Sequence, residues 1–455
     1  MEIQLVGRQW TNDTLYDFIA VGIGPFNLSL ACLCSPLQNI SCLFLDKAPD
    51  FSWHPGLLIE GTTLQNPFLA DMVSMADPTS SFSYLNYCKQ KGHLYNFYIR
   101  EDYYPSRLEF NNYCRWTTEQ LDNLHFSHEV QGITFDEAGA FYVIEGLDLV
   151  TNNTFYYKAK KLVIGVGSEP QLPDVFDDKD QAYRVHSSHY LPNKSDLMQC
   201  KNITVVGSGQ SGAEVFYDLL CDPATREAQI NWVSRASRFF QMETGKLTLD
   251  LITPDCTDYF FDLEQSDKKS ELLNQRNIYT GVNQSLINKI YDLLDDRREN
   301  KHCFPQILPN LILEECRRNE QSQNYELVFN HKHHQQRYQH NTDGLVMATG
   351  YHPLIPKFIS GVEHKIRWTE KGRYIQAKNW SVDVSENEIF VQNAGVESHG
   401  LSNPDIGLSC YRNSELIRHL TGHDYYPQEL QTSYQQFSPK EHSGFIPLTS
   451  GMQTR

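Results

Sequence analysis

The sequence predicts an α/β protein with two Rossmann-like domains and a small, mostly helical region. Four short apolar runs end in glycine-rich segments, which is typical of buried parallel strands. Two of these runs continue into turns with a dinucleotide-binding pattern, at residues 22–27 and 207–212. Two such turns, 185 residues apart, indicate two nucleotide-binding domains, with the second inserted into the first.

The first turn follows a strand predicted over residues 16–21. Gly22 and Gly24 would let the backbone approach a pyrophosphate at the start of the next helix, whereas Asn27 takes the place of the third glycine. A second strand, over residues 41–45, leads into Asp46, whose carboxylate would accept hydrogen bonds from ribose hydroxyls. Strand, turn, helix and acid together favour a dinucleotide site over a tight turn without a ligand.

The second turn carries the complete Gly-x-Gly-x-x-Gly pattern and an additional serine, at Gly207, Gly209, Ser211 and Gly212. The strand expected over residues 230–233 is followed by Ser234 and Arg235, where a site for NADH would place an acidic residue. A hydroxyl and a guanidinium suit a 2′-phosphate, so the sequence predicts NADPH. The alternative, that Arg235 is only a solvated surface charge, stays open.

The same pattern sets the predicted domain boundaries. Residues 1–195 form the first part of the first domain, and residues 196–342 form the inserted domain, with the helical substrate region at about 245–300. Residues 343–455 return to the first domain with a C-terminal lid and a loosely packed tail from Asp424. Residues 301–341 are polar and are expected to be irregular. The histidines at 331–340 lack an ordered spacing, so a solvated loop is favoured over a metal site.

The composition argues against several classes of protein. A net charge of −17 disfavours nonspecific binding to nucleic acid or anionic membranes, and it would suit a cationic substrate. The apolar stretch at residues 18–37 is interrupted by Gly22, Gly24 and Pro25, so no membrane span or targeting segment is expected. Eleven cysteines without a Cys-x-x-Cys pair fit a reducing cytoplasm and argue against a disulfide reductase. Whether the chain forms a homo-oligomer stays open.

Taken together, the motifs resemble the microbial N-hydroxylating flavin monooxygenases, the family of the lysine and ornithine N-hydroxylases of siderophore biosynthesis. The pattern is nearest to the diamine and histamine N-monooxygenases. Asn27, which interrupts the first glycine pattern, is itself what this family carries. The resemblance covers nearly the whole chain and rests on residues 22–28, 53–56, 64–69, 77–80, 207–212, 343, 348–351 and 399–401.

The resemblance implies FAD in the first domain and NADPH in the second. It further implies that a C4a-hydroperoxyflavin, formed with molecular oxygen, hydroxylates a small cationic primary amine and gives a hydroxylamine for siderophore assembly. Trp53, His54 and Gln65 would lie near the flavin, with Gln65 as the candidate catalytic residue that supports the oxygenated cofactor. The site must also favour the neutral amine, because a free alkylamine has a pKa near ~10.4.

The chain departs from the ornithine hydroxylases at two positions. Those enzymes carry a lysine where this chain has Ala70 and an asparagine where it has Leu249, and both hold the substrate α-carboxylate. A buried carboxylate without partners is costly. The departures therefore predict an amine without a carboxylate, such as putrescine, cadaverine or histamine. Asp405 would receive a distal ammonium or imidazolium, although an ordinary loop turn is equally consistent with its position.

Two other functions remain as alternatives. The first is L-lysine or L-ornithine N-hydroxylation, and the second is a non-catalytic sensor that binds flavin and NADPH. Formation of a hydroxylamine distinguishes a sensor from an enzyme. A ketone-oxidising flavin monooxygenase is disfavoured because residues 183–190 lack the Phe-x-Gly-x-x-x-His-x-x-x-Trp pattern of those enzymes.

Overall fold

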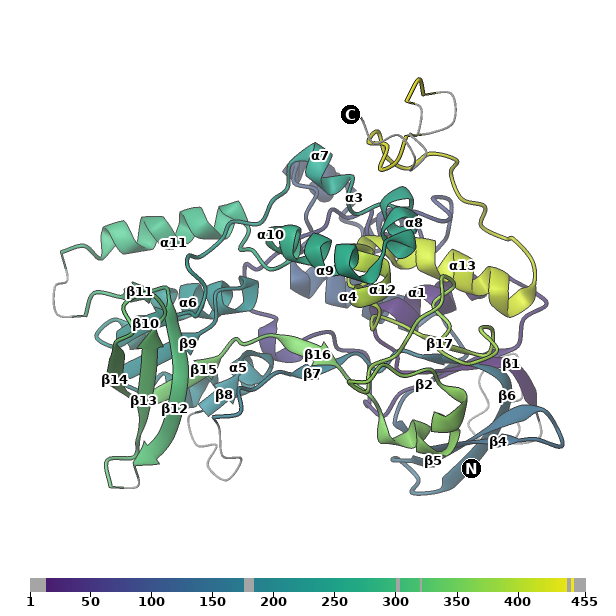
Figure 1. The fold of residues 1–455 in the computed structure, drawn as a ribbon, viewed down its shortest axis with the longest axis horizontal. Coiled ribbons are helices and arrows are strands. Elements are labelled where there is room, and N and C mark those ends of the chain that lie inside the picture. The colour runs from purple at the N-terminus through teal and green to yellow at the C-terminus, as the bar shows by residue number, and fades with distance from the viewer. Residues whose placement is uncertain (1–13, 176–183, 300–302, 320, 440–442, 446–455) are drawn as a thin grey trace, which may run out of the picture.

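The computed structural model describes residues 14–175, 184–299, 303–319, 321–439 and 443–445, and it consists of two units joined by a narrow link. Figure 1 shows the first unit on the right and the second on the left. The antiparallel strands β7 (Ser168–Pro170) and β16 (Tyr351–Pro353) lie between them. These strands carry the chain out to the second unit and back, so the second unit lies within the chain of the first.

The first unit is built on a seven-stranded sheet. Its order is β3-β2-β1-β6-β5-β4, and β17 pairs with β6. The pairs β1–β2, β2–β3, β1–β6 and β6–β17 are parallel, whereas β5 pairs with both β6 and β4 in antiparallel orientation. The strand bounds are β1 (Leu15–Val21), β2 (Cys42–Leu45), β3 (Leu124–His125), β4 (His128–Asp136), β5 (Phe141–Asp148), β6 (Thr154–Ile164) and β17 (Ile389–Val391).

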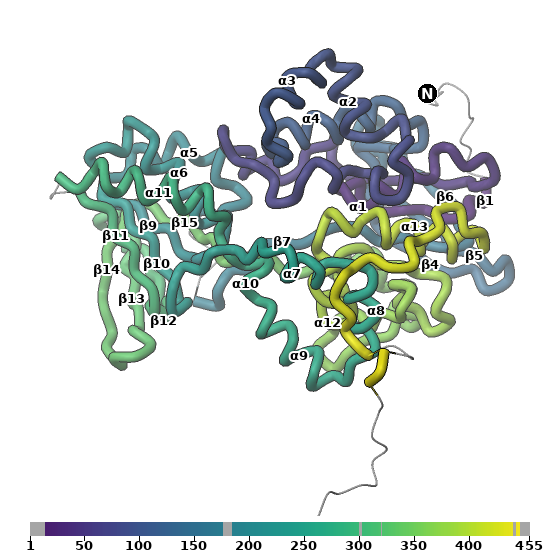
Figure 2. The backbone as a smooth tube through the Cα atoms, turned by 90° about the horizontal axis from the view of Figure 1, so that it is seen from above, coloured from purple at the N-terminus to yellow at the C-terminus, as the bar shows by residue number. Residues whose placement is uncertain are grey.

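Strand β1 is buried on both faces, which explains its nearly unbroken apolar sequence. Phe18 packs into the core beneath the helices, and Ile19 packs into the core on the opposite face of the sheet. Helix α1 lies against α4 and α13 over this sheet (Figure 2). The helices of the first unit are α1 (Pro25–Cys34), α2 (Tyr84–Gln90), α3 (Leu94–Arg100), α4 (Arg107–Thr118), α12 (Val396–His399) and α13 (Ser409–Thr421).

The second unit has a five-stranded parallel sheet in the order β11-β10-β9-β15-β8. Helix α6 follows β9 and packs against α11. These elements give the strand–turn–helix unit that the second glycine pattern predicts. Their bounds are β8 (Arg184–His186), α5 (Tyr190–Leu197), β9 (Asn202–Val206), α6 (Gln210–Cys221), β10 (Gln229–Val233), α11 (Gln284–Asp296), β11 (Gln306–Leu308) and β15 (Gly344–Met347).

The prediction of irregular structure over residues 301–341 is wrong. This stretch forms an antiparallel sheet of β12 (Leu311–Asn319), β13 (Asn324–His331) and β14 (Arg337–Thr342). Strand β13 buries every second side chain, including Leu327 and Phe329, in a core shared with Met347 of the parallel sheet. The burial of this alternating face stabilises strands in a segment that is polar on average. Histidines 331, 333 and 334 lie at the exposed turn between β13 and β14.

The second unit is also larger than its predicted range of 196–342. Strands β8 and β15 both pair within its parallel sheet, where Met347 of β15 lies beside Val206 of β9. The return to the first unit therefore comes after β15, rather than at residue 343. The sequence pattern alone does not show which of two parallel sheets a short apolar strand joins.

The helical region at about 245–300 is present but is divided between the units. It comprises α7 (Lys246–Leu249), α8 (Pro254–Asp262), α9 (Gln265–Asn274), α10 (Arg276–Tyr279) and α11. Helices α8 and α9 pack against α12 of the first unit, whereas α11 packs against α6. Figure 2 shows α7 and α10 between the two units, α8 and α9 with the first unit, and α11 with the second.

The tail is packed more tightly than its composition predicts. The backbone N–H groups of Thr432 and Ser433 donate to the carboxylate of Asp255, at 3.0 and 3.1 Å, at the start of α8. The described part of the tail thereby crosses the helical region. Tyr183 and residues 440–442 and 446–455 lie outside the described residues.

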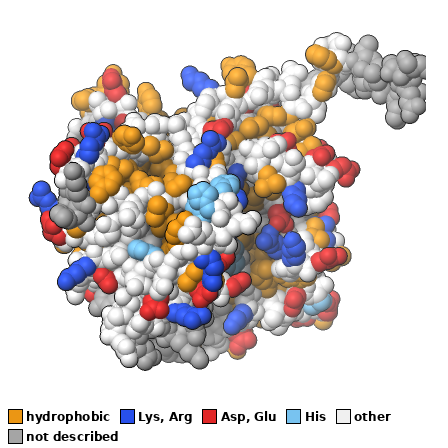
Figure 3. Space-filling view, turned by 60° about the vertical axis from the view of Figure 1, so that its left-hand side comes forward, with side chains coloured by type: hydrophobic (Ala, Val, Ile, Leu, Met, Phe, Trp, Pro, Cys, Tyr) orange, Lys and Arg blue, Asp and Glu red, His pale blue; other side chains and the backbone are white. Residues whose placement is uncertain are grey.

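The surface carries charges of both signs. Figure 3 shows acidic and basic side chains interspersed with hydrophobic ones on one face of the molecule. Among the helices that the structure describes, none combines the length and the apolar character required to span a membrane. The eleven cysteines are free, and most are buried.

Candidate active site

Three adjoining cavities lie along the elements that meet between the two units. The turn cavity, of about 980 Å³, is lined by the first glycine turn. The central cavity, of about 550 Å³, shares Trp53, His54 and Ser168 with the turn cavity. The outer cavity, of about 580 Å³, shares Gln65 and Tyr104 with the central cavity. The central and outer cavities are lined by residues of both units, and the turn cavity by residues of the first unit and of the link between the units.

The glycines of the turn cavity provide the tight turn and the open space that a dinucleotide pyrophosphate requires. Gly22 adopts φ +94°, and a Cβ atom there would overlap the carbonyl oxygen of Gly165. A Cβ on Gly24 would meet no protein atom within 4 Å, so this glycine faces open space. Helix α1 begins at the next residue, Pro25, and its N-terminus favours an anion at this position. The cavity therefore fits the pyrophosphate of FAD.

Asp46 and Asn27 have different relations to this cavity. Asp46 lines it, and its carboxylate accepts hydrogen bonds from the N–H groups of Ile23 at 2.6 Å and Ala48 at 2.8 Å. Asn27 is buried behind the turn, where its Nδ2 donates to the carbonyl oxygen of Gly22 at 2.8 Å. Asn27 thus holds the turn in place and is not among the residues that line the cavity.

Trp53 and His54 line both the turn cavity and the central cavity. Their ring centroids are 5.0 Å apart. His54 adopts φ +50° and ψ +52°, a left-handed conformation that is uncommon for any residue with a side chain. Its ring can be reached from the cavities but is enclosed by protein, and this desolvation, together with the charge of Arg107, lowers its pKa to about 4. His54 is therefore neutral at pH 7.

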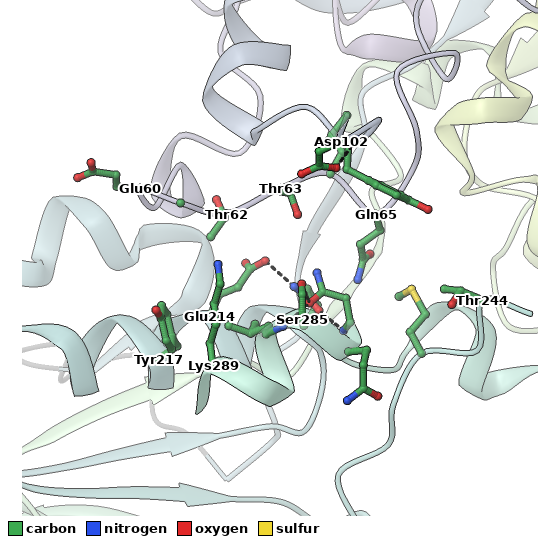
Figure 4. A pocket seen from close by; sticks show the side chains of 18 of the residues that line it. Glu60, Thr62, Thr63, Gln65, Asp102, Glu214, Tyr217, Thr244, Ser285 and Lys289 are labelled. Atoms are coloured by element: carbon green, nitrogen blue, oxygen red, sulfur yellow. Dashed lines mark hydrogen bonds between the residues drawn. The ribbon is translucent and has the colours of Figure 1, made fainter. Parts of the chain in front are cut away.

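Gln65 extends from the loop of the first unit into the space between the units (Figure 4). Its Nε2 atom is buried and has no hydrogen-bond partner among the described residues. A buried amide N–H without a partner is destabilising, so such groups are rare unless a ligand engages them. This orphaned donor fits the predicted position of Gln65 beside a cofactor.

Of the three predicted substrate residues, two line the central cavity and one does not. Leu249, at the end of α7, lines the central cavity together with Ile252 and Ile278, which gives the cavity an apolar wall. Asp405 lines the same cavity. Ala70 is buried in the hydrophobic core and is not among the residues that line the central cavity.

Asp405 is held in a fixed position. Its Oδ1 accepts hydrogen bonds from Asn66 Nδ2 at 2.9 Å and from the N–H of Gly407 at 2.7 Å. Burial raises the pKa of this carboxyl, while the hydrogen bonds and the charge of Arg412 act in the opposite direction. Arg412 is 1% exposed, and its guanidinium donates to the carbonyl oxygen of Asn403 at 2.6 Å.

The second glycine turn is built like the first. Gly207 adopts φ +136°, and a Cβ there would overlap the carbonyl oxygen of Ala348. A Cβ on Gly212 would lie 2.6 Å from the carbonyl oxygen of Gly207, so this glycine allows α6 to pack closely on the strand. At Gly209 the nearest protein atom to a Cβ would be 3.7 Å away, which leaves room for a ligand. Ser211 lines the central cavity.

The two residues that follow β10 differ in their exposure. Ser234 is buried, and its hydroxyl accepts a hydrogen bond from the N–H of Ala236 at 3.0 Å. Arg235 is exposed at the end of the strand. Arg235 therefore has the freedom to meet a phosphate, whereas the Ser234 hydroxyl stabilises its own turn.

Sequence reasoning missed an ion pair between the units. Arg107 begins α4 and lines the central cavity, and its Nη1 atom lies 2.7 Å from Oε2 of Glu214 on α6. The pattern Ser106-x-x-Glu109 could have located the start of α4, since the Ser106 hydroxyl caps the helix. It carries no signal for a partner 107 residues away. Among the described residues, no group of three or more His, Cys, Asp or Glu side chains is placed to hold a metal ion.

Comparison with known proteins identifies the family. Residues 14–353 match the family model described as L-lysine 6-monooxygenase/L-ornithine 5-monooxygenase. The chain is 46% identical to the alcaligin biosynthesis enzyme of Bordetella pertussis, over 94% of this chain and 93% of the relative. It is 41% identical to the putrescine N-hydroxylase of Shewanella oneidensis, over 94% and 85% of the two chains.

A solved structure agrees with these sequence relatives. It is that of DfoA, the desferrioxamine-pathway cadaverine monooxygenase of Erwinia amylovora, bound to FAD. The TM-score is 0.90 and the sequence identity is 42%, over 94% of this chain and 99% of that one.

Proposed function

The chain belongs to the L-lysine 6-monooxygenase/L-ornithine 5-monooxygenase family, and on this premise we propose that it uses FAD and NADPH to N-hydroxylate an alkane diamine for siderophore biosynthesis. The observation that carries the proposal is the central cavity, which combines an apolar wall with the carboxylate of Asp405. Relatives named for putrescine and cadaverine support a diamine over histamine among the three amines that the sequence predicts.

The residues of the two turns would hold the two cofactors. The open space at Gly24 and the carboxylate of Asp46 suit FAD in the turn cavity. The room at Gly209, the N-terminus of α6 and the exposed Arg235 suit NADPH in the second unit. When bound, FAD supplies oxygen transfer and NADPH supplies the reducing equivalents. The chain contributes binding, orientation and electrostatics, and Gln65 presents its unpaired donor to this space.

The wall of the central cavity favours a substrate without an α-carboxylate. Leu249, Ile252 and Ile278 contribute aliphatic side chains, which would leave a carboxylate without hydrogen bonds. Among the residues that line this cavity, Arg107 is the one with a Lys or Arg side chain, and its guanidinium is already paired with Glu214 and so is not free to bind a carboxylate. Asp405 instead offers a negative charge to the second ammonium group of a diamine.

The charges of the cavity also support hydroxylation at one end of the diamine. The reacting nitrogen must be neutral to use its lone pair, although a free alkylamine has a pKa near ~10.4. The positive charge of Arg107, which acts on His54, disfavours a second cation at that end of the cavity. Asp405 favours the charged form of the other amine. The diamine would therefore lie with its neutral nitrogen toward His54 and its ammonium at Asp405.

The proposal is tested by measuring NADPH oxidation and hydroxylamine product with ornithine, lysine, putrescine, cadaverine and histamine in turn. We expect a hydroxylamine from the diamines and little from the two amino acids. Efficient hydroxylation of lysine or ornithine would contradict the substrate assignment and leave the flavin chemistry intact. Binding of both cofactors without a hydroxylamine from any of the amines would favour the sensor.

A further inference from the structure

A buried ion pair joins the two units at the central cavity. Arg107 belongs to the first unit and Glu214 to the second, and their side chains are 15% and 1% exposed. A carboxylate so deeply buried is costly unless a cation neutralises it. Glu214 therefore depends on Arg107, and the guanidinium is fixed where the units meet.

Glu214 is also tied to the second glycine turn. Its Oε1 accepts a hydrogen bond from Nε2 of Gln210 at 2.8 Å, and Gln210 is part of that turn. Oε1 of Gln210 in turn accepts from the N–H of Asn283 at 2.9 Å, at the start of α11. Figure 4 shows Glu214 on the α6 side of the outer cavity, with the hydrogen bonds of this group drawn as dashed lines. Side-chain hydrogen bonds thus connect the first turn of α6 to Arg107.

Arg107 extends this connection to the reacting end of the central cavity. It lines the cavity with His54, Gln65 and Tyr351. Burial lowers the pKa of His54 and raises that of Tyr351, and the positive charge of Arg107 acts toward a lower pKa in both. The ring centroids of His54 and Tyr351 are 6.0 Å apart. Movement of the guanidinium would therefore alter the electrostatic field at this end of the cavity.

We propose that Glu214 is a positioning residue that holds Arg107 at the wall of the central cavity and thereby couples the NADPH turn to the reacting end of the cavity. This inference rests on the proposed function, since it treats the central cavity as the place of reaction. Gln210 and Glu214 lie one helical turn apart on α6, so a dinucleotide that orders the N-terminus of this helix also orders the acid that holds Arg107.

The test is a double-mutant cycle with Glu214→Gln, Arg107→Gln and the double variant, made in the full-length chain. Glu214→Gln keeps the size of the side chain and removes its charge. The readouts are the dissociation constant of NADP⁺ and the yield of hydroxylamine per NADPH oxidised. We expect Glu214→Gln to change at least one readout about tenfold in the wild-type background and less than about twofold when Arg107 is already glutamine. Equal effects in both backgrounds would overturn the proposal.

Asp218→Asn provides the matched control. Asp218 lies one turn further along α6 and pairs with Lys194 at 2.7 Å and with the Tyr190 hydroxyl at 2.6 Å, all within the second unit. We expect this variant to lower the melting temperature but leave NADP⁺ affinity and coupling unchanged. If it alters both readouts as Glu214→Gln does, loss of helix stability is the cause and the inference is wrong. Failure of the proposed function would instead appear as a wild-type enzyme without hydroxylamine product, while the NADP⁺ cycle would still test the link.

Discussion

Asn66 Nδ2 donates a hydrogen bond to Asp405 Oδ1 at 2.9 Å and so joins two loops that are 339 residues apart in the chain. Asn66 directly follows Gln65, whose unpaired amide reaches the central cavity. The bond therefore fixes the carboxylate of Asp405 relative to the residue expected beside the flavin. The protein structure therefore sets the distance between Gln65, at the flavin end of the substrate site, and Asp405, at the opposite end.

Replacement of Asp405 by asparagine tests its role toward the distal ammonium. We expect the KM for putrescine or cadaverine to rise about tenfold or more, because a hydrogen bond to a charged group is worth roughly 1.5–3 kcal/mol. Pentylamine, which lacks the second amine, should lose little in the same variant. The measurement is steady-state hydroxylamine formation with both substrates. An equal loss on cadaverine and pentylamine would indicate a structural role for Asp405.

The first glycine turn gives a matched pair of variants for cofactor binding. Gly24→Ala adds a methyl group to open space at an ordinary backbone conformation, so the apoprotein should fold normally. We expect its affinity for FAD to fall about tenfold or more, since the methyl group enters the space required for the close approach of the pyrophosphate. Gly22→Ala should instead lower the melting temperature of the apoprotein, because its Cβ would overlap Gly165. Wild-type FAD affinity in Gly24→Ala, measured by fluorescence titration, would contradict the placement of the cofactor.

Arg235 is predicted to select NADPH over NADH. We expect Arg235→Ala to raise the KM for NADPH about tenfold and to leave the KM for NADH nearly unchanged, because only NADPH carries the 2′-phosphate. Arg238→Ala is the control, since the Arg238 guanidinium lies over the Phe240 ring at 4.6 Å. It should have the smaller effect. If Arg235→Ala weakens both dinucleotides alike, Arg235 does not read the phosphate.

Two deeply buried histidines predict loss of stability in mild acid. Burial lowers the pKa of His186 to about 4 and that of His399 to about 3, from 6.5 in the unfolded chain. As the pH falls below 6.5, the unfolded chain takes up protons at these positions before the folded protein does, so folding stability decreases. The melting temperature should therefore fall between pH 6.5 and 4.5, above the range in which ordinary carboxyl groups, with pKa values of about 4, take up most of their protons. A constant melting temperature across this interval would show that these histidines do not control acid stability.

The strands and helices that could be predicted are those with a clear pattern within one short segment of the sequence. The strand before Gly22, the strand before Gly207 and the helical region at about 245–300 each have a pattern within a single segment. The sheet of β12, β13 and β14 was missed because its alternating apolar residues, such as Leu327 and Phe329, occur in a segment that is polar on average. The mean hydropathy of such a segment does not reveal that every second residue is apolar and forms one face of a strand.

Contacts between distant segments could not be predicted. Arg107 and Glu214 are 107 residues apart, and neither belongs to a motif that specifies a partner. The same holds for the tail, where Asp255 binds backbone groups 177 residues away. At Ala70 the resemblance marks the position of a lysine in the ornithine hydroxylases, and the structure places Ala70 in the core. A sequence motif shows which position of the family a residue corresponds to. Whether that residue lines the cavity depends on how the chain packs.

The most direct test of the substrate assignment is competition between cadaverine and L-lysine, which differ only by the α-carboxylate. Both would be supplied at equal concentration with FAD, NADPH and oxygen, and the two hydroxylamines would be quantified by mass spectrometry. The apolar wall at Leu249 and the carboxylate of Asp405 predict that N-hydroxycadaverine exceeds N-hydroxylysine by at least about tenfold, equivalent to about 1.4 kcal/mol. An excess of N-hydroxylysine would show that the cavity holds an α-carboxylate after all.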